Sequence, residues 1–190
     1  MRPTVFRSAF LLLLGALAWA GCGDPLSLLP AVFENRVDTL AMYAASGTAV
    51  TLPSGFLIAQ RVPVRLDQVN NFDFLYDVTP SGEHVFLPIA ALVSTGRTTG
   101  NPGFQLSSDD FDAITVALQQ GYVSTDTVRI AAGQVYFARS AVDPSCGLGI
   151  PYYAKLQVLG FDDSARKVAF RILANINCGY RGLEVGLPKK

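Results

Sequence analysis

The chain has 190 residues, of which 50% are hydrophobic and 16% charged, and its formal net charge is zero. This composition excludes a disordered chain, which would be poor in hydrophobic residues. Charges of both signs are scattered without long runs, so the sequence offers no basic surface for a nucleic acid.

Residues 1–21 have the features of an export signal. Arg2 and Arg7 supply positive charge, and an apolar run of twelve residues extends from Ala9 to Ala20. This length suits a signal peptide and falls short of the roughly 20 residues that a membrane-spanning helix needs. Removal of the segment leaves one domain of ordinary size with a small net negative charge.

Two cleavage sites remain open at the end of this signal. An A-x-A site at residues 18–20 would release a soluble secreted or periplasmic protein. Alternatively, Ala-Gly-Cys at residues 20–22 resembles the lipobox of bacterial lipoproteins, with Trp19 at a position where that family usually has leucine. The resemblance implies cleavage before Cys22 and attachment of fatty acyl chains, such as palmitate, to this cysteine.

The lipobox resemblance also implies a cellular location. Cys22 becomes the lipid-anchored N-terminus in the bacterial envelope, and Gly23, rather than aspartate, at the next position implies the outer membrane over the inner one. Residues 22–30, which contain Pro25 and Pro30, form a short tether to the domain at 31–190.

The domain at 31–190 shows short apolar segments separated by turns, which is typical of an all-β fold. Residues 36–44 fit either a strand or a helix, and we expect a strand. Residues 55–67 have extended character, and Pro63 places that segment at a sheet edge or a bulge, because proline cannot donate a ladder hydrogen bond.

Residues 71–78 alternate between an aromatic face and a mostly polar face, which predicts a strand. Thr-Pro-Ser-Gly at 79–82 predicts a type I turn, and the returning strand covers 83–87. Residues 126–130 and 134–140, which flank a glycine, predict another strand pair.

Residues 107–120 are the one candidate for a short helix in the domain. Ser107 or Ser108 can cap it, and acidic residues occupy its first turn. The β-branched residues inside the segment and Gly121 just after it fit a strand or a loop equally well.

The clearest element is a hairpin near the C-terminus. Its two strands bury apolar faces if Phe170 lies opposite Ala154, with a three-residue loop at 161–163. If the two strands are extended in this register, Cys178 lies opposite Cys146. In the register shifted by two residues, the two cysteines are only two positions from facing each other. The apolar faces consist of Ala154, Leu156 and Val158 on the first strand and Val168, Phe170, Ile172 and Ala174 on the second.

The chain has three cysteines, and an odd number in an exported protein leaves one thiol without a partner. Lipidation of Cys22 accounts for the odd one, so Cys146 and Cys178 are expected to form a disulfide in an oxidising compartment. All elements together predict a mainly β fold: a single antiparallel β-sandwich or closed β-barrel of around ten strands, with at most one short helix near 107–120.

Side chains that carry catalytic or metal chemistry are few. His84 is the only histidine, and its position after the turn predicts a solvated hairpin residue rather than a base or a metal ligand. The aspartates within 109–112 lack the spacing of a calcium loop, and those at 162–163 are expected in a turn. Phosphate-binding glycine patterns and a serine-hydrolase elbow are missing from the sequence, so we expect no enzyme, cofactor or metal.

Residues 175–188 are the most unusual stretch of the sequence. Tyr180 and Arg181 are candidates for the lip of a ligand site, in which the guanidinium pairs with an anionic group and the ring stacks, with Tyr152 and Tyr153 as its wall. The alternative is a disulfide-pinned turn, in which Arg181 and Glu184 form an ordinary surface pair.

The sequence therefore predicts a non-enzymatic envelope lipoprotein, a binding or structural accessory of the outer membrane. Its expected partners are the membrane, through the N-terminal lipid, and an envelope protein held by an exposed sheet edge or loop. A small-ligand or glycan-binding sandwich is one alternative. A hydrolase is another, and it would require two carboxylates about 5–9.5 Å apart in a cleft.

Overall fold

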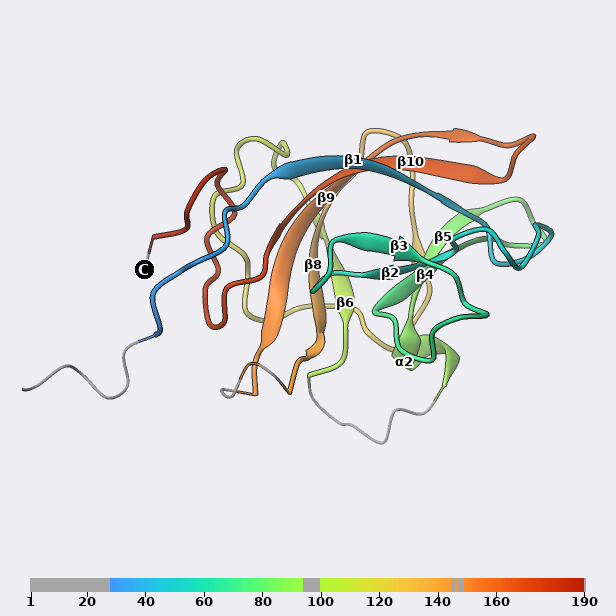
Figure 1. The fold of residues 1–190 in the computed structure, drawn as a ribbon. Coiled ribbons are helices and arrows are strands. Elements are labelled where there is room, and N and C mark those ends of the chain that lie inside the picture. The colour runs from blue at the N-terminus through green and yellow to red at the C-terminus, as the bar shows by residue number, and fades with distance from the viewer. Residues whose placement is uncertain (1–27, 94–99, 145, 147–148, 190) are drawn as a thin grey trace, which may run out of the picture.

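The computed structural model describes residues 28–93, 100–144, 146 and 149–189, so the predicted signal and Cys22 lie outside the described residues. The described chain forms two separate antiparallel sheets of five strands, which pack face to face (Figure 1). The predicted β-sandwich is confirmed, and the alternative of a closed barrel is wrong. No helix in the described part of the chain is long and apolar enough to cross a membrane.

The two sheets are called sheet I and sheet II, and their strands are given in spatial order. Sheet I consists of β1 (Val37–Tyr43), β10 (Lys167–Asn175), β9 (Pro151–Asp162), β8 (Val135–Val142) and β6 (Gly103–Ser107). Sheet II consists of β3 (Val62–Val64), β2 (Gly55–Leu57), β4 (Phe74–Val78), β5 (His84–Pro88) and β7 (Val128–Arg129), and the short helix α2 (Ile89–Leu92) follows β5.

Several predicted strands appear where their sequence pattern placed them. β1 confirms the strand at 36–44, and β3 with Pro63 is an edge strand of sheet II. β4 and β5 form the expected hairpin, in which the Gly82 N–H closes the turn by donating to the Thr79 carbonyl at 2.9 Å.

Aromatic side chains fill the space between the two sheets. The rings of Phe74 and Phe86 on sheet II lie 4.7 and 5.1 Å from the ring of Phe104 on sheet I. Each such contact adds roughly 0.5–1.5 kcal/mol beyond the burial of apolar area. The inter-sheet core is therefore held by rings that neither sheet can bury alone.

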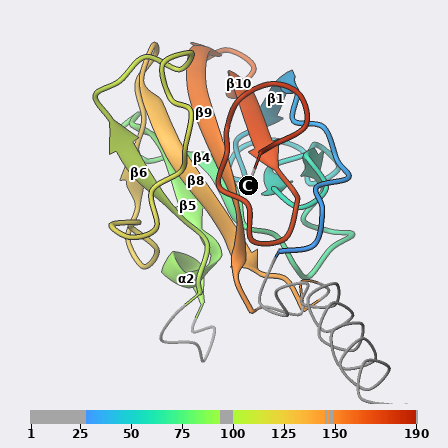
Figure 2. The same cartoon turned by 90° about the vertical axis from the view of Figure 1, so that its left-hand side faces the viewer.

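A second, smaller core lies on the outer face of sheet I, beneath residues 108–127 and the C-terminal segment (Figure 2). Residues 108–120 lie here as turns and irregular chain instead of the short helix that was considered for 107–120. The reason is that Thr115 and Ala117 exchange backbone hydrogen bonds of 2.7 and 2.8 Å with the C-terminal segment, and apolar side chains of the stretch pack on the sheet. The cluster consists of Phe111, Ile114, Ala117, Val135, Phe137, Tyr153, Leu173 and Leu183.

The strand pair predicted on either side of Gly133 is wrong. β7 belongs to sheet II, whereas β8 belongs to sheet I. Gly133 has a φ of +83°, a backbone conformation that favours glycine, and its turn carries the chain from one sheet to the other. Local alternation identified both strands but held no information about their partners.

The hairpin of β9 and β10 buries the predicted faces in a different register. Phe170 lies opposite Val158 instead of Ala154, an even shift that keeps the predicted apolar face between Phe170 and Asn175. A β-bulge between Ala169 and Phe170 changes the register again, and Val168 still lies in the inter-sheet core. The loop expected at 161–163 is displaced, because Phe161 is an apolar strand residue and its ring stacks on His84 with centroids 3.7 Å apart.

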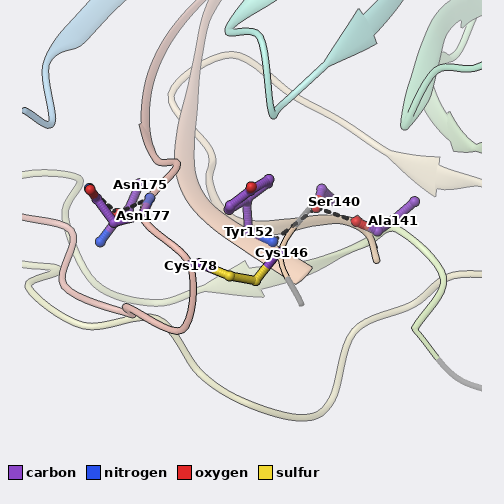
Figure 3. Close-up of a disulfide and its surroundings, with 7 residues drawn as sticks. All are labelled: Ser140, Ala141, Cys146, Tyr152, Asn175, Asn177 and Cys178. Atoms are coloured by element: carbon purple, nitrogen blue, oxygen red, sulfur yellow. Dashed lines mark hydrogen bonds between the residues drawn. A yellow bond between two sulfur atoms is a disulfide. The ribbon is translucent and has the colours of Figure 1, made fainter. Parts of the chain in front are cut away.

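The disulfide between Cys146 and Cys178 is present, with Cα atoms 5.5 Å apart (Figure 3). The observed register alone would leave Cys146 away from Cys178. The chain before β9 turns back instead, since the Cys146 N–H donates to the Asp143 carbonyl at 3.1 Å. The predicted pairing is confirmed, although the predicted register is not its cause.

We expect Cys178→Ser to lower the free energy of unfolding by about 3–4 kcal/mol, because the bond closes a loop of roughly 33 residues in the unfolded chain. Urea denaturation of the oxidised wild type and the variant measures the difference. A reductant should bring the wild type to the stability of the variant and leave the variant unchanged. Equal stability of the two oxidised proteins would contradict the expectation.

Asp73 joins the two sheets through its carboxylate. The alternation of 71–78 placed it on the polar face, but its side chain is buried. One carboxylate oxygen accepts the N–H of Ile58, just after β2, and the other accepts the N–H of Ala141 in β8, both at 2.7 Å. Burial is the main cause that raises the pKa of Asp73 to about 6.

The raised pKa gives a pH-dependent stability with a defined sign. The folded protein binds the Asp73 proton more tightly than the unfolded chain, so this stabilisation is present below pH 4 and is lost as the pH rises through about 6. Relative to Asp73→Asn, the wild type should lose about 2 kcal/mol of unfolding free energy between pH 4 and pH 7. Urea titrations at both pH values measure this change, and the exposed Asp109→Asn is the matched control for the loss of one carboxylate.

Candidate functional site

The two ends of the described chain meet on the outer side of sheet I. Residues 28–36, which lead into β1, lie beside residues 176–189, which follow β10 and are called the strap here (Figures 1 and 2). Asn35 and Gly186 exchange backbone hydrogen bonds of 2.8 and 2.9 Å. The surface formed by residues 28–34, 115–116 and 179–189 is called the chain-end face below.

Buried asparagine side chains hold the entering segment. The Asn177 carbonyl oxygen accepts the N–H groups of Val32 and Phe33 at 2.8 and 2.9 Å, and its amide nitrogen donates to the Phe33 carbonyl at 2.7 Å. Asn177 lies next to Cys178, so the disulfide fixes the residue that holds this segment (Figure 3). The chain before β1 is thereby attached to the fold at a covalently pinned position.

Two further asparagines hold the strap. Asn175 at the end of β10 donates to the Gly182 carbonyl at 2.8 Å, and Asn35 donates to the carbonyls of Gly182 and Glu184 at 3.0 Å each. These amides satisfy main-chain groups that have no strand partner, which is the usual requirement for buried backbone. The sequence pattern did not predict these roles. Asn-Ile-Asn at the end of a strongly apolar strand is a signal for Asn175 and Asn177, and Asn35 has no comparable signal.

A groove with a volume of about 510 Å³ opens on the chain-end face. Tyr180 and Arg181 line it, but their polar groups are engaged: the Tyr180 hydroxyl donates to the Leu29 carbonyl at 2.9 Å and the Arg181 guanidinium to the Ala117 carbonyl at 3.0 Å. Among the described ion pairs, none joins Arg181 to Glu184.

The four tyrosine and arginine candidates for a ligand site are not brought together. Tyr152 belongs to the inter-sheet core, and Tyr153 belongs to the cluster on the outer face of sheet I. Only Tyr180 and Arg181 line the groove, so the four candidates do not surround one site.

Large apolar side chains are exposed around the groove. Leu29 is 79% exposed and Val185 72%, and Val32, Phe33 and Leu187 are each more than half exposed. The same face carries acidic and basic side chains at Glu34, Arg181, Glu184 and Lys189. An exposed apolar group with a polar rim is characteristic of a surface that contacts a membrane or another protein.

His84 is not the solvated residue that the sequence predicted, because its side chain is only 17% exposed. Nδ1 lies 2.7 Å from the Tyr76 hydroxyl, Nε2 lies 3.2 Å from an Asp163 carboxylate oxygen, and the ring stacks on Phe161. Tyr76 itself is fully buried, so no substrate reaches its hydroxyl. The chain Asp163–His84–Tyr76 therefore links the β9–β10 hairpin to sheet II.

Asp112, Asp162 and Asp163 have structural partners. Asp112 pairs with Arg171 at 3.2 Å. Asp162 is the last residue of β9 and not a turn residue, although it accepts hydrogen bonds from the Ser164 hydroxyl and the Ala165 N–H in the turn at 2.7 and 3.0 Å. Asp163 lies in the turn as predicted. Within the described ranges, no three histidine, cysteine or acidic side chains gather as a metal site would require.

Lys155 is a buried charge that the sequence analysis did not single out. Its ammonium donates to the Ile114 carbonyl at 2.8 Å and lies 4.7 Å from the centre of the Phe111 ring. Burial lowers the pKa of Lys155. The residue points outward from β9, so the chain that covers the outer face of sheet I removes it from water.

Comparison of the chain with protein-family models, curated proteins and solved structures gave no significant match. The functional assignment therefore depends on the residues of this chain alone.

We expect Asn177→Ala to release residues 28–34 while the sandwich stays folded, because the N–H groups of Val32 and Phe33 lose their acceptor. Hydrogen exchange should show a loss of protection of about 1–3 kcal/mol at these two amides. The exposed Asn71→Ala is the control. Unchanged exchange at Val32 and Phe33 in Asn177→Ala would show that the asparagine does not hold the segment.

Proposed function

We propose that the protein is a lipoprotein of the outer membrane, a non-catalytic accessory domain held at the bilayer by acyl chains on Cys22. The observation that carries the proposal is the fixed attachment of residues 28–36 to the domain through Asn177, Asn35 and Tyr180. Such attachment is what a domain needs if its tether is to set its position at a membrane. The Cys146–Cys178 disulfide supports an oxidising compartment outside the cytoplasm.

The tether sets how far the domain can move from the bilayer. Six chain steps separate Cys22 from Leu28, the first described residue, and they span at most about 20 Å when fully extended. More than one acyl chain on Cys22 makes the anchor stable, whereas a single chain binds only marginally. The chain-end face consequently stays near the lipid headgroups.

The non-catalytic part of the proposal rests on the roles that the candidate side chains already have. His84 joins two elements of the sandwich, and Arg181 donates to a main-chain carbonyl. These groups serve packing, which supports an accessory role in which the domain holds an envelope partner.

The part of the domain available to such a partner lies away from the chain ends. β10 is nine residues long, about 30 Å, and the turn between β9 and β10 lies at its far end (Figure 1). Residues 44–54 and the turn at 79–82 lie at the same end, since Ala44 and Ala45 bond to Arg166 and Tyr76.

Native mass spectrometry of the protein extracted from its envelope in mild detergent tests the proposal. We expect a mass equal to residues 22–190 plus a diacylglycerol and a further acyl chain, and Cys22→Ala should abolish this species. A mass equal to residues 21–190 without lipid would overturn the proposal. A co-purifying protein would identify the partner, and a co-purifying small molecule would favour the ligand-binding alternative.

A further inference from the structure

We infer that the chain-end face rests directly on the lipid bilayer, with the side chains of Leu29, Phe33, Val185 and Leu187 inserted among the headgroups. This inference rests on the proposed acylation of Cys22 and adds an orientation to it. The lipid anchor and a surface of the domain then bind the membrane together, and the anchor is not merely a flexible tether.

Exposed apolar side chains are concentrated on this face. Leu29, Val32, Phe33, Val185 and Leu187 all expose more than half of their surface. Backbone bonds between Asn35 and Gly186 bring the two segments that carry these side chains together. Other apolar residues exposed to this degree are scattered over separate elements, at Val50, Val93 and Leu106.

The short distance between this face and the proposed anchor favours lipid over a protein as the occupant. A tether of about 20 Å ends at Leu28, on this face and beside its groove. The effective concentration of bilayer at this face is therefore high, so a weak insertion that would fail for a free protein is sufficient for an anchored one.

The charges of the chain-end face also permit contact with a bilayer. Glu34 and Glu184 on this face are offset by Arg181 and Lys189. The face therefore carries no excess of negative charge that would repel an anionic bilayer. Because hydrogen bonds from Asn177 and Tyr180 hold residues 29–33, the apolar side chains stay on one side of the domain.

The absence of tryptophan from the mature domain gives a direct test, since Trp19 is the only tryptophan and lies in the signal. We would prepare acylated L187W and V50W chains and reconstitute them in vesicles of phosphatidylcholine and phosphatidylglycerol with brominated acyl chains. Leu187 and Val50 are similarly exposed, at 55% and 65%, and equally anchored, but Val50 lies beyond the far end of β1. Bromine quenches only an indole within the bilayer.

We expect bromine quenching of L187W to exceed that of V50W at least about twofold, since an inserted side chain reaches roughly 5–10 Å into the interface. Adding Val185→Asp to L187W should reduce the quenching toward that of V50W. Equal quenching in L187W and V50W would overturn the inference. Protection of L187W from aqueous acrylamide without bromine quenching would also overturn it, because a protein surface would then cover the face.

Mass spectrometry of the same preparations separates the two proposals. An acylated chain whose L187W emission is not quenched overturns the docking and leaves the lipoprotein proposal intact. A chain without acyl groups on Cys22 overturns the lipoprotein proposal, and the docking with it.

Discussion

Three buried asparagine side chains and one disulfide determine how both ends of the domain are placed. A segment without a strand partner can lie against a sheet only if its N–H and C=O groups find hydrogen bonds elsewhere. Asn35, Asn175 and Asn177 supply these bonds to the entering segment and to the strap, and all three are almost fully buried. Cys178, adjacent to Asn177, ties the same region covalently to the chain that leads into β9.

The covering of sheet I follows from this arrangement. The strap brings Leu183 over the outer face of β9 and β10, and its bridge to Val116 holds residues 108–120 beside it. This cover buries residue types that are seldom buried, and Lys155 is one of them. The ammonium is tolerated there because it keeps a carbonyl partner and lies against an aromatic ring.

The two ends of the sandwich therefore differ in a way that suits the proposed function. The chain-end face is apolar, rigidly held and close to the proposed anchor. At the other end, the β9–β10 turn is polar and is joined to sheet II through His84 and Asp163. A domain built in this way can lie on a membrane with one surface and meet a partner with the opposite one.

The sequence by itself determined the features that depend on local pattern. Alternation identified the strands and the buried faces of the last hairpin, and proline's missing N–H placed Pro63 at a sheet edge. The cysteine count paired Cys146 with Cys178, once Cys22 was set aside as a lipidation site. None of these required knowledge of which segments meet in space.

Only the tertiary structure decided the register of that hairpin, the separate sheets of β7 and β8, and the environments of His84, Asp73 and Asn177. Shifts by an even number of residues preserve every face, so alternation cannot distinguish between registers. A histidine after a turn or an asparagine after a strand has the same local sequence whether water or another segment covers it. What covers each of them comes from residues far away in the chain, and this long-range packing produced both the chain-end face and the link between the sheets.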